Sequence, residues 1–224
     1  MGLFDKIGSL FEKKTCDVCG GEIGLLGNRK LEDGNLCKEC AAKLSPLFSD
    51  RRGSTVEQIK EQLAYRAENE GRVAALSPTR MVGKGTRLVI DDNARCFVVV
   101  SSSGWRNDNP DVIDFSQVIG CNTEVRETKT EIKREKEDGT KESFNPPRFD
   151  FDYDMYVTID INSPYFDRIC FKVNGPRIEH RNSPEFHDNE RLMYDIRDVL
   201  EDMRTGASHE PDAESAAYDD EAAW

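Results

Sequence analysis

Apolar residues recur at helical spacing in three segments of the chain. Residues 1–13 predict a short amphipathic helix, and residues 54–76 predict a linking helix with Ser54 as its N-cap. A third helix begins at the cap Ser183, with Pro184 at its first position. The apolar stripes consist of Leu3, Phe4, Ile7, Leu10 and Phe11 in the first helix, Val56, Ile59, Leu63, Val73 and Leu76 in the second, and Phe186, Met193, Ile196, Leu200 and Met203 in the third.

Between the second and third helices the apolar period changes to that of β-strands. Residues 124–148 are polar on both alternating sets, with Asp138 and Gly139 near the middle, which predicts a long solvated hairpin. Antiparallel strands closed by one amphipathic helix predict a small α+β barrel or sandwich at residues 78–204. The other strands are expected within residues 86–100, around an Asp-Asp-Asn turn, and within residues 111–125 and 154–173.

Four of the seven cysteines form two C-x-x-C pairs separated by seventeen residues. Each pair brings two thiolates into one tight turn, and two such turns complete a tetrahedral Zn²⁺ site. Asp33 and Gly34 between the pairs predict a hairpin turn, and residues 37–48 predict a helix that carries the last ligand. We therefore predict a treble-clef zinc finger at residues 14–50, with structural Zn²⁺ bound by Cys16, Cys19, Cys37 and Cys40.

A metal explains this segment better than its alternatives do. About 35 residues with few apolar side chains cannot fold by burial alone, and metal binding, worth about 10 to 16 kcal/mol in finger peptides, supplies the deficit. A redox switch through the paired thiols is the alternative. Catalytic zinc requires an open coordination position, which four thiolates do not leave. Cys96, Cys121 and Cys170 stand alone in apolar surroundings and are interpreted as small buried hydrophobic residues.

The order of strands and final helix, with the stretches VIDDNARCFVV and VIDFSQVIG, resembles pleckstrin-homology or GRAM-like domains. Together with CDVCGG and LEDGNLCKECAAKLS, the chain resembles a bacterial family of uncharacterised function that joins a four-cysteine finger to such a domain. This resemblance implies a binding or adaptor role. Lipid-binding pleckstrin domains carry basic residues in the first hairpin, whereas the turn here is DDNAR, which argues against phosphoinositide binding.

The remaining motifs argue against an enzyme. A phosphate loop would require Gly at the position of Pro78 and Ser or Thr at the position of Gly85. Residues 101–111 predict a connecting loop, in which Trp105 exposed at the tip would be a contact residue. The histidines His180, His187 and His209 lie near the last helix or in the tail and suit capping or surface roles.

Charge and hydropathy limit the partners. The net charge is −12, and residues 205–224 contain six acids and no Lys or Arg, which predicts a disordered acidic tail. The tail is either an inert solubilising segment or, through Tyr218 and Trp224, a short peptide that binds a partner. Nucleic-acid binding through the finger, by Arg29, Lys30, Lys38 and Lys43, ranks last, because acids interrupt that patch and the chain lacks a basic footprint.

The N-terminal pattern bears on location. No apolar run approaches the roughly 20 residues of a membrane span, and a secretory signal pattern is missing, so we expect a cytoplasmic protein. The stripe of residues 1–13 either lies on the inner face of the membrane or on a partner, or packs on the protein's own body. We predict a non-enzymatic zinc-binding adaptor or scaffold with an unidentified protein partner; a redox- or zinc-responsive sensor is the alternative, and nucleic-acid binding the third.

Overall fold

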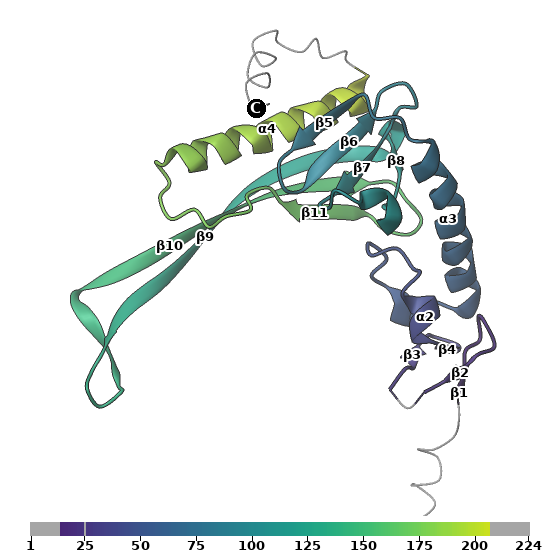
Figure 1. The fold of residues 1–224 in the computed structure, drawn as a ribbon, viewed down its shortest axis with the longest axis horizontal. Coiled ribbons are helices and arrows are strands. Elements are labelled where there is room, and N and C mark those ends of the chain that lie inside the picture. The colour runs from purple at the N-terminus through teal and green to yellow at the C-terminus, as the bar shows by residue number, and fades with distance from the viewer. Residues whose placement is uncertain (1–13, 25, 207–224) are drawn as a thin grey trace, which may run out of the picture.

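A computed structural model of the protein describes residues 14–24 and 26–206 (Figure 1). The predicted N-terminal helix, with its apolar residues Leu3, Phe4, Ile7, Leu10 and Phe11, and the tail from residue 207 onward lie outside the described residues. Within the described ranges, none of the helices is long and apolar enough to cross a membrane. The chain is a mixed α+β protein: a cysteine-bearing unit is followed by a long helix, two antiparallel sheets and a C-terminal helix.

Two short hairpins and a four-residue helix make up the N-terminal unit. Asp33 and Gly34 form the predicted turn of the second hairpin, where the backbone N–H of Leu31 donates to the carbonyl of Gly34 at 2.9 Å. The small apolar core of the unit includes Leu31, Leu36 and, from the next helix, Ile59. The elements are β1 (Lys14–Thr15) paired with β2 (Glu22–Ile23), β3 (Arg29–Lys30) paired with β4 (Asn35–Leu36), the helix α2 (Lys38–Ala41) and the 3-10 helix η1 (Arg51–Gly53).

The long helix α3 (Val56–Ala75) begins one residue later than predicted. Its N-cap is Thr55, whose hydroxyl accepts from the backbone N–H of Gln58 at 3.3 Å, while the Gln58 side chain accepts from the N–H of Thr55 at 2.9 Å. The prediction of Ser54 as the cap was wrong, because the Ser54 hydroxyl donates to the Asp50 carbonyl, 2.7 Å away, and stabilises the preceding turn instead.

The body contains a four-stranded sheet of order β5-β6-β7-β8 and a three-stranded sheet of order β11-β10-β9. Among the described residues no strand pairing joins the two sheets, so the barrel alternative was wrong. β8 pairs only with Cys96 and Phe97, so among the described residues the second half of β7 pairs with β6 on one side and with no strand on the other. The strands are β5 (Arg80–Gly83), β6 (Arg87–Asp91), β7 (Cys96–Val100), β8 (Ile113–Asp114), β9 (Val118–Glu135), β10 (Lys141–Ile161) and β11 (Arg168–Lys172).

The turn between β5 and β6 requires one particular glycine. Gly83 has φ +122°, a conformation that residues with a side chain rarely adopt. A Cβ atom at this position would lie 2.5 Å from the carbonyl oxygen of Thr86. Gly85, in the same turn, has open space where its Cβ would be.

The helix α4 (Pro184–Thr205) covers the main core. Ser183 caps it and Pro184 starts it, as predicted, and the predicted stripe from Phe186 to Met203 is buried. The core beneath is shared by both sheets, because Leu88, Ile90 and Phe97 of the first sheet and Met155, Val157 and Ile159 of the second belong to one apolar cluster. The opposite face of the first sheet packs with Val73 and Leu76 at the end of α3.

β9 and β10 continue past the body as the predicted long hairpin (Figure 1). Their pairing extends from Val118 and Ile161 to Glu135 and Lys141, with a register shift between Ser143 and Arg148. We call the part beyond Arg126 and Asp154 the arm; its charged side chains are solvated and its exposed apolar residues are Ile132 and Phe149. The arm is therefore held together mainly by strand pairing and by contacts between side chains on its surface. In one such contact, the Lys129 ammonium lies 4.0 Å from the centre of the Phe149 ring.

A buried carboxylate fixes the connection between α3 and the first sheet. Asp91 accepts hydrogen bonds from the backbone N–H groups of Ala94 at 2.9 Å and Ser77 at 2.8 Å. These bonds favour the ionised carboxylate and hold the pKa of Asp91 below its ordinary value. The same side chain thereby orders the β6–β7 turn and the residues that lead into β5.

Candidate metal centre and the cavity beside it

The first C-x-x-C pair lies in a tight turn between β1 and β2. The backbone N–H of Cys16 donates to the Gly21 carbonyl, and the N–H of Gly20 donates to the Cys16 carbonyl, both at 2.8 Å. Gly20 has φ +72°, which favours glycine and lets the chain reverse directly after Cys19. The turn therefore presents the Cys16 and Cys19 thiols on the same side.

The second pair is positioned by the start of α2. Cys37 is the N-cap of this helix, and its sulfur accepts from the backbone N–H of Cys40 at 3.3 Å. The N–H of Cys37 in turn donates to the sulfur of Cys16 at 3.3 Å, which joins the two turns directly. Hydrogen bonds of this kind favour thiolate sulfur, because the N–H dipole points at the negative charge.

The four sulfur atoms form one cluster of metal-binding size. All lie within 4.8 Å of one another, and the Cys19 and Cys37 sulfurs are 3.8 Å apart. A tetrahedral ion with metal–sulfur distances of about 2.3 Å places its ligands about 3.8 Å from one another, so a small contraction of the cluster would fit such an ion. Cys16, Cys37 and Cys40 are buried and Cys19 is exposed. The predicted ligands are therefore brought together, and they could hold a metal ion.

The electrostatics of the cluster favour a cation. Burial opposes ionisation of Cys16, but the backbone N–H groups of Cys19, Cys37 and Val18 outweigh it and lower the Cys16 pKa to about 6. Burial and the neighbouring thiols raise the pKa of Cys40 above its ordinary value, because a second nearby negative charge is unfavourable. A divalent cation removes that conflict, since it stabilises all four thiolates at once.

The other cysteines and the histidines are not gathered at this site. Cys96 is buried as predicted, Cys121 is half-buried, and the prediction was wrong for Cys170, which is exposed. Cys170 pairs with Thr158 on the outer face of the sheet, one residue out of phase with the core positions of β11. Of the histidines within the described ranges, His187 and His180 have exposed side chains.

The family described as Domain of unknown function (DUF4428) matches residues 15–62. The match contains all four clustered cysteines and ends at Gln62, one turn beyond Ile59, which completes the apolar core of the N-terminal unit. Both sheets lie outside it. No curated protein and no solved structure matches the chain.

A buried polar junction joins the N-terminal unit to the sheets. The buried stripe of α3 is polar in its middle, where Gln62, Arg66 and Asn69 follow Ile59. The Arg66 guanidinium lies 3.0 Å from the Asp111 carboxylate, and the side chains are 7% and 2% exposed. Asp111 also accepts from the Ser45 hydroxyl at 2.7 Å. The Asp111 carboxylate, which lies in the loop before β8, thus contacts both the loop after α2 and the helix α3.

Trp105, in the loop before β8, is buried, so the prediction that it is exposed was wrong. Trp105 begins the 3-10 helix η2 (Trp105–Asp108) and is only 8% exposed. It packs in the cluster between α3 and the first sheet, together with Val73 and Val100. The Arg106 guanidinium fastens η2 to the end of α3 by donating to the carbonyls of Val73 and Leu76.

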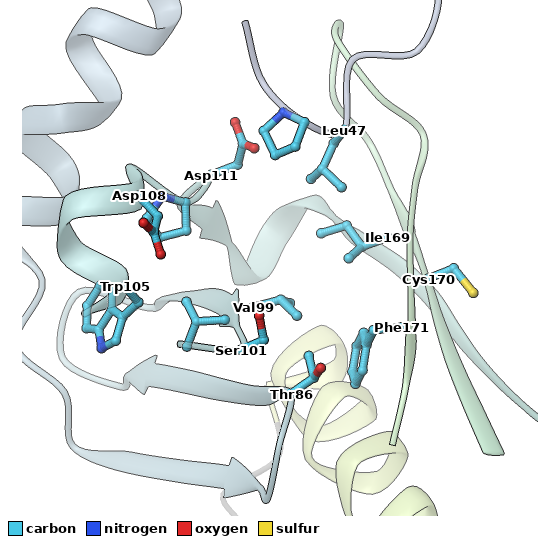
Figure 2. Close-up of a pocket in the computed structure, with 13 residues that line it drawn as sticks. Leu47, Thr86, Val99, Ser101, Trp105, Asp108, Asp111, Ile169, Cys170 and Phe171 are labelled. Carbon is cyan, nitrogen blue, oxygen red and sulfur yellow. The ribbon is translucent and has the colours of Figure 1, made fainter. Parts of the chain in front are cut away.

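Beside this junction the two sheets leave an open cavity of about 370 Å³ (Figure 2). Val99 of β7 and Ile169 and Phe171 of β11 form apolar walls, and Cys170 points away from the space. Leu47, from the loop after α2, lies at another side of it. Polar groups at its rim come from Thr86, Ser101, Asp108 and Asp111. The cavity therefore lies between β7 and β11, and the loop after α2 completes it; we call it the seam cavity.

Proposed function

We propose that the protein is a non-enzymatic zinc-binding adaptor that holds an apolar anchor group of a protein partner in the seam cavity. One observation carries the proposal: Leu47, only seven residues after the last clustered cysteine, lines a cavity whose other walls come mainly from the sheets and from the loop that contains η2. An apolar cavity of this size with a few polar groups at its rim is typical of binding sites. Partner binding would then depend on the metal-supported fold of the N-terminal unit.

The finer assignments belong to the same proposal. Zn²⁺ is the metal that four thiolates in two C-x-x-C turns select, and with all four positions filled it is structural. The hairpin and helix around the cysteines suit a treble-clef finger. The two sheets and C-terminal helix suit a pleckstrin-homology or GRAM-like body, and the combination suits the bacterial family that the sequence resembles. The tether at residues 1–13, on a membrane or a partner, remains a prediction.

The experiment compares two variants of one loop. The tagged full chain is used to capture proteins from native lysate, with quantitative mass spectrometry as the readout, for the wild type, Leu47→Asp and the control Lys43→Gln, which makes the same change of one charge at an exposed side chain outside both cavities. We expect a partner that is retained by the wild type and the control, lost by Leu47→Asp, removed by chelation and restored by Zn²⁺. Identical captured sets in all samples would contradict the proposal.

A second candidate, a redox-responsive switch, is favoured by the exposure of Cys19 at an otherwise buried cluster. Hydrogen peroxide would take two electrons from two thiolates, so that one disulfide forms, two protons are consumed, two waters are produced and Zn²⁺ leaves. A chain with Ser at positions 96, 121 and 170 isolates the four clustered thiols. Zinc release at equimolar peroxide, reversed by a thiol reductant, supports this role, and retention of zinc under those conditions excludes it.

A further inference from the structure

A second cavity, of about 510 Å³, lies on the N-terminal unit and carries unusual charge. Its lining includes Arg29 of β3, Arg51 of η1 and Arg66 of α3. Asp108 is the carboxylate among the residues that line it, and this side chain already accepts a hydrogen bond from the Ser102 hydroxyl at 2.7 Å. The lining is therefore net positive in a chain whose net charge is −12.

Two of the three guanidinium groups of this cavity, those of Arg29 and Arg51, lack a carboxylate partner among the described residues. Arg29 and Arg51 donate to the backbone carbonyls of Leu26 and Lys30, at 3.4 and 3.0 Å, and within the part of the chain that the structure describes neither forms an ion pair. Burial, followed by the positive charges of Arg29 and Arg52, lowers the pKa of Arg51. Arginines elsewhere, such as those at the exposed pairs of the sheets, contact carboxylates directly. Arg29 and Arg51 therefore bring two guanidinium groups that have no carboxylate partner among the described residues to one cavity.

Arg66 adds a buried donor. The side chain pairs with Asp111 through Nη1 and with the Asn109 carbonyl through Nη2, but its buried Nε–H has no partner among the described residues. Apolar side chains of Leu44, Pro46 and Phe48 also line the cavity. Arginine binds carboxylate and phosphate oxygens well because its planar fork presents several donors. The cavity therefore suits a ligand that combines negative charge with an apolar or aromatic group.

The chain itself contains a segment of that chemistry. Residues 207–224 carry six acids and no Lys or Arg, and within them Tyr218 is followed directly by Asp219, Asp220 and Glu221. We propose that Tyr218–Glu221 docks intramolecularly on the arginine-lined cavity, with its carboxylates on Arg29 and Arg51 and the tyrosine ring against the apolar wall. The cavity is then a site for peptides that contain acidic and aromatic residues. A partner with such a segment would compete with the chain's own tail for this cavity.

The described contacts connect α4 to α3, which carries part of the cavity lining. α4 contacts the 3-10 helix η3 (Phe115–Gln117), whose cap Asp114 lies 2.6 Å from Arg72 of α3. Along α3, Arg66 is six residues, or about 9 Å, from Arg72. Tyr218 is twelve residues after Gly206, and an extended chain of that length spans about 40 Å. The tail is therefore longer than the stretch of α3 between Arg72 and Arg66, along which we propose that it lies.

Photo-crosslinking in the full chain tests the contact. p-Benzoylphenylalanine replaces Tyr218, and crosslinked peptides are mapped by mass spectrometry. We expect crosslinks to residues 41–51, a loss of about tenfold in Arg29→Glu/Arg51→Glu, and a similar loss at 1 M NaCl, where the screening length is about 3 Å. The control Lys38→Glu/Lys43→Glu changes the same number of charges on α2 and directly after it, outside the cavity lining, and should retain most of the crosslink. Metal content verifies that each variant is folded.

A charge exchange makes the test independent of folding defects. Adding Asp219→Lys/Asp220→Lys to the arginine-reversed chain should restore the crosslink. Crosslinks that map elsewhere, or that persist unchanged in Arg29→Glu/Arg51→Glu, overturn the proposal. Crosslinks between ¹⁵N-labelled and unlabelled chains overturn its intramolecular form. Protection of residues 41–51 from hydrogen exchange by inorganic phosphate or by RNA, in a wild-type chain that gives no tail crosslink, also overturns it and assigns the cavity to phosphate.

Discussion

The Arg66–Asp111 pair allows a sharp test of how the N-terminal unit is held on the sheets. In Asp111→Ala the guanidinium of Arg66, which is 7% exposed, stays buried without its counter-charge, and Ser45 loses its acceptor. Removing one partner of a buried ion pair costs about 3 to 5 kcal/mol, because the remaining charge is desolvated and uncompensated. For a chain of this size that corresponds to a fall in melting temperature of roughly 10 °C.

The exposed Arg80–Asp92 pair is the matched control. Its nitrogen–oxygen distance is also 3.0 Å, but its side chains are 32% and 42% exposed. Water solvates the remaining Arg80 guanidinium after the change, so Asp92→Ala should cost no more than about 1 kcal/mol. Thermal unfolding and urea titration of both variants at equal metal content give the two free energies of unfolding.

A double variant separates charge from packing. Arg66→Met combined with Asp111→Leu removes both ions and should regain most of the stability that Asp111→Ala loses, since apolar replacement of a complete buried pair is often neutral. If Asp111→Ala and Asp92→Ala cost the same, or if the double variant is as unstable as the single one, the reasoning about burial at this junction is refuted.

Three further predictions follow from the structure. Cys40→Ser should lose the stoichiometric metal measured by mass spectrometry, whereas the exposed Cys170→Ser should keep it; equal metal contents would refute the assignment of ligands. Backbone hydrogen bonds lower the pKa of Asp91, so its contribution to stability is complete above the ordinary aspartate value of about 3.9 and is lost as the pH falls through the folded-state pKa; below pH 4 the wild type should lose more stability than Asp91→Asn in urea titrations, and parallel losses would contradict this. Gly83→Ala should cost about 1 to 3 kcal/mol in thermal unfolding, because of its positive φ and the Thr86 carbonyl, whereas Gly85→Ala in the same turn should be nearly neutral.

Local signals in the sequence predicted much of the fold. The C-x-x-C spacing identified the four clustered cysteines, because both members of each pair lie in one turn and need no long-range information. Ser183, Pro184 and the stripe up to Met203 identified α4, and Asp138-Gly139 identified the tip of the long hairpin. In each case neighbouring residues carry the whole signal.

Contacts between distant residues were missed. Arg66 and Asp111 are 45 positions apart, and a polar residue on a helix gives no sign of its partner. The 3-4-3 spacing of Ile59, Gln62, Arg66 and Asn69 was nevertheless a signal, since it continues the buried stripe through polar positions. The pattern alone did not show whether the sheets close into a barrel, because alternating strands fit a barrel and an open sandwich equally. In the structure β8 pairs with only two residues of β7, and the two sheets stay separate.

The arm has a consequence for the behaviour of the protein in concentrated solution. β9 pairs only with β10 within the described residues, so its outer edge offers a long row of free backbone groups to strands of other molecules. The side chains along it alternate in sign through residues such as Lys129, Glu131 and Lys133. Two copies brought edge to edge would meet hydrated ammonium and carboxylate groups, and this hydration opposes growth of a fibre. Because salt screens exposed charges, we expect a high salt concentration to weaken this protection against edge-to-edge association.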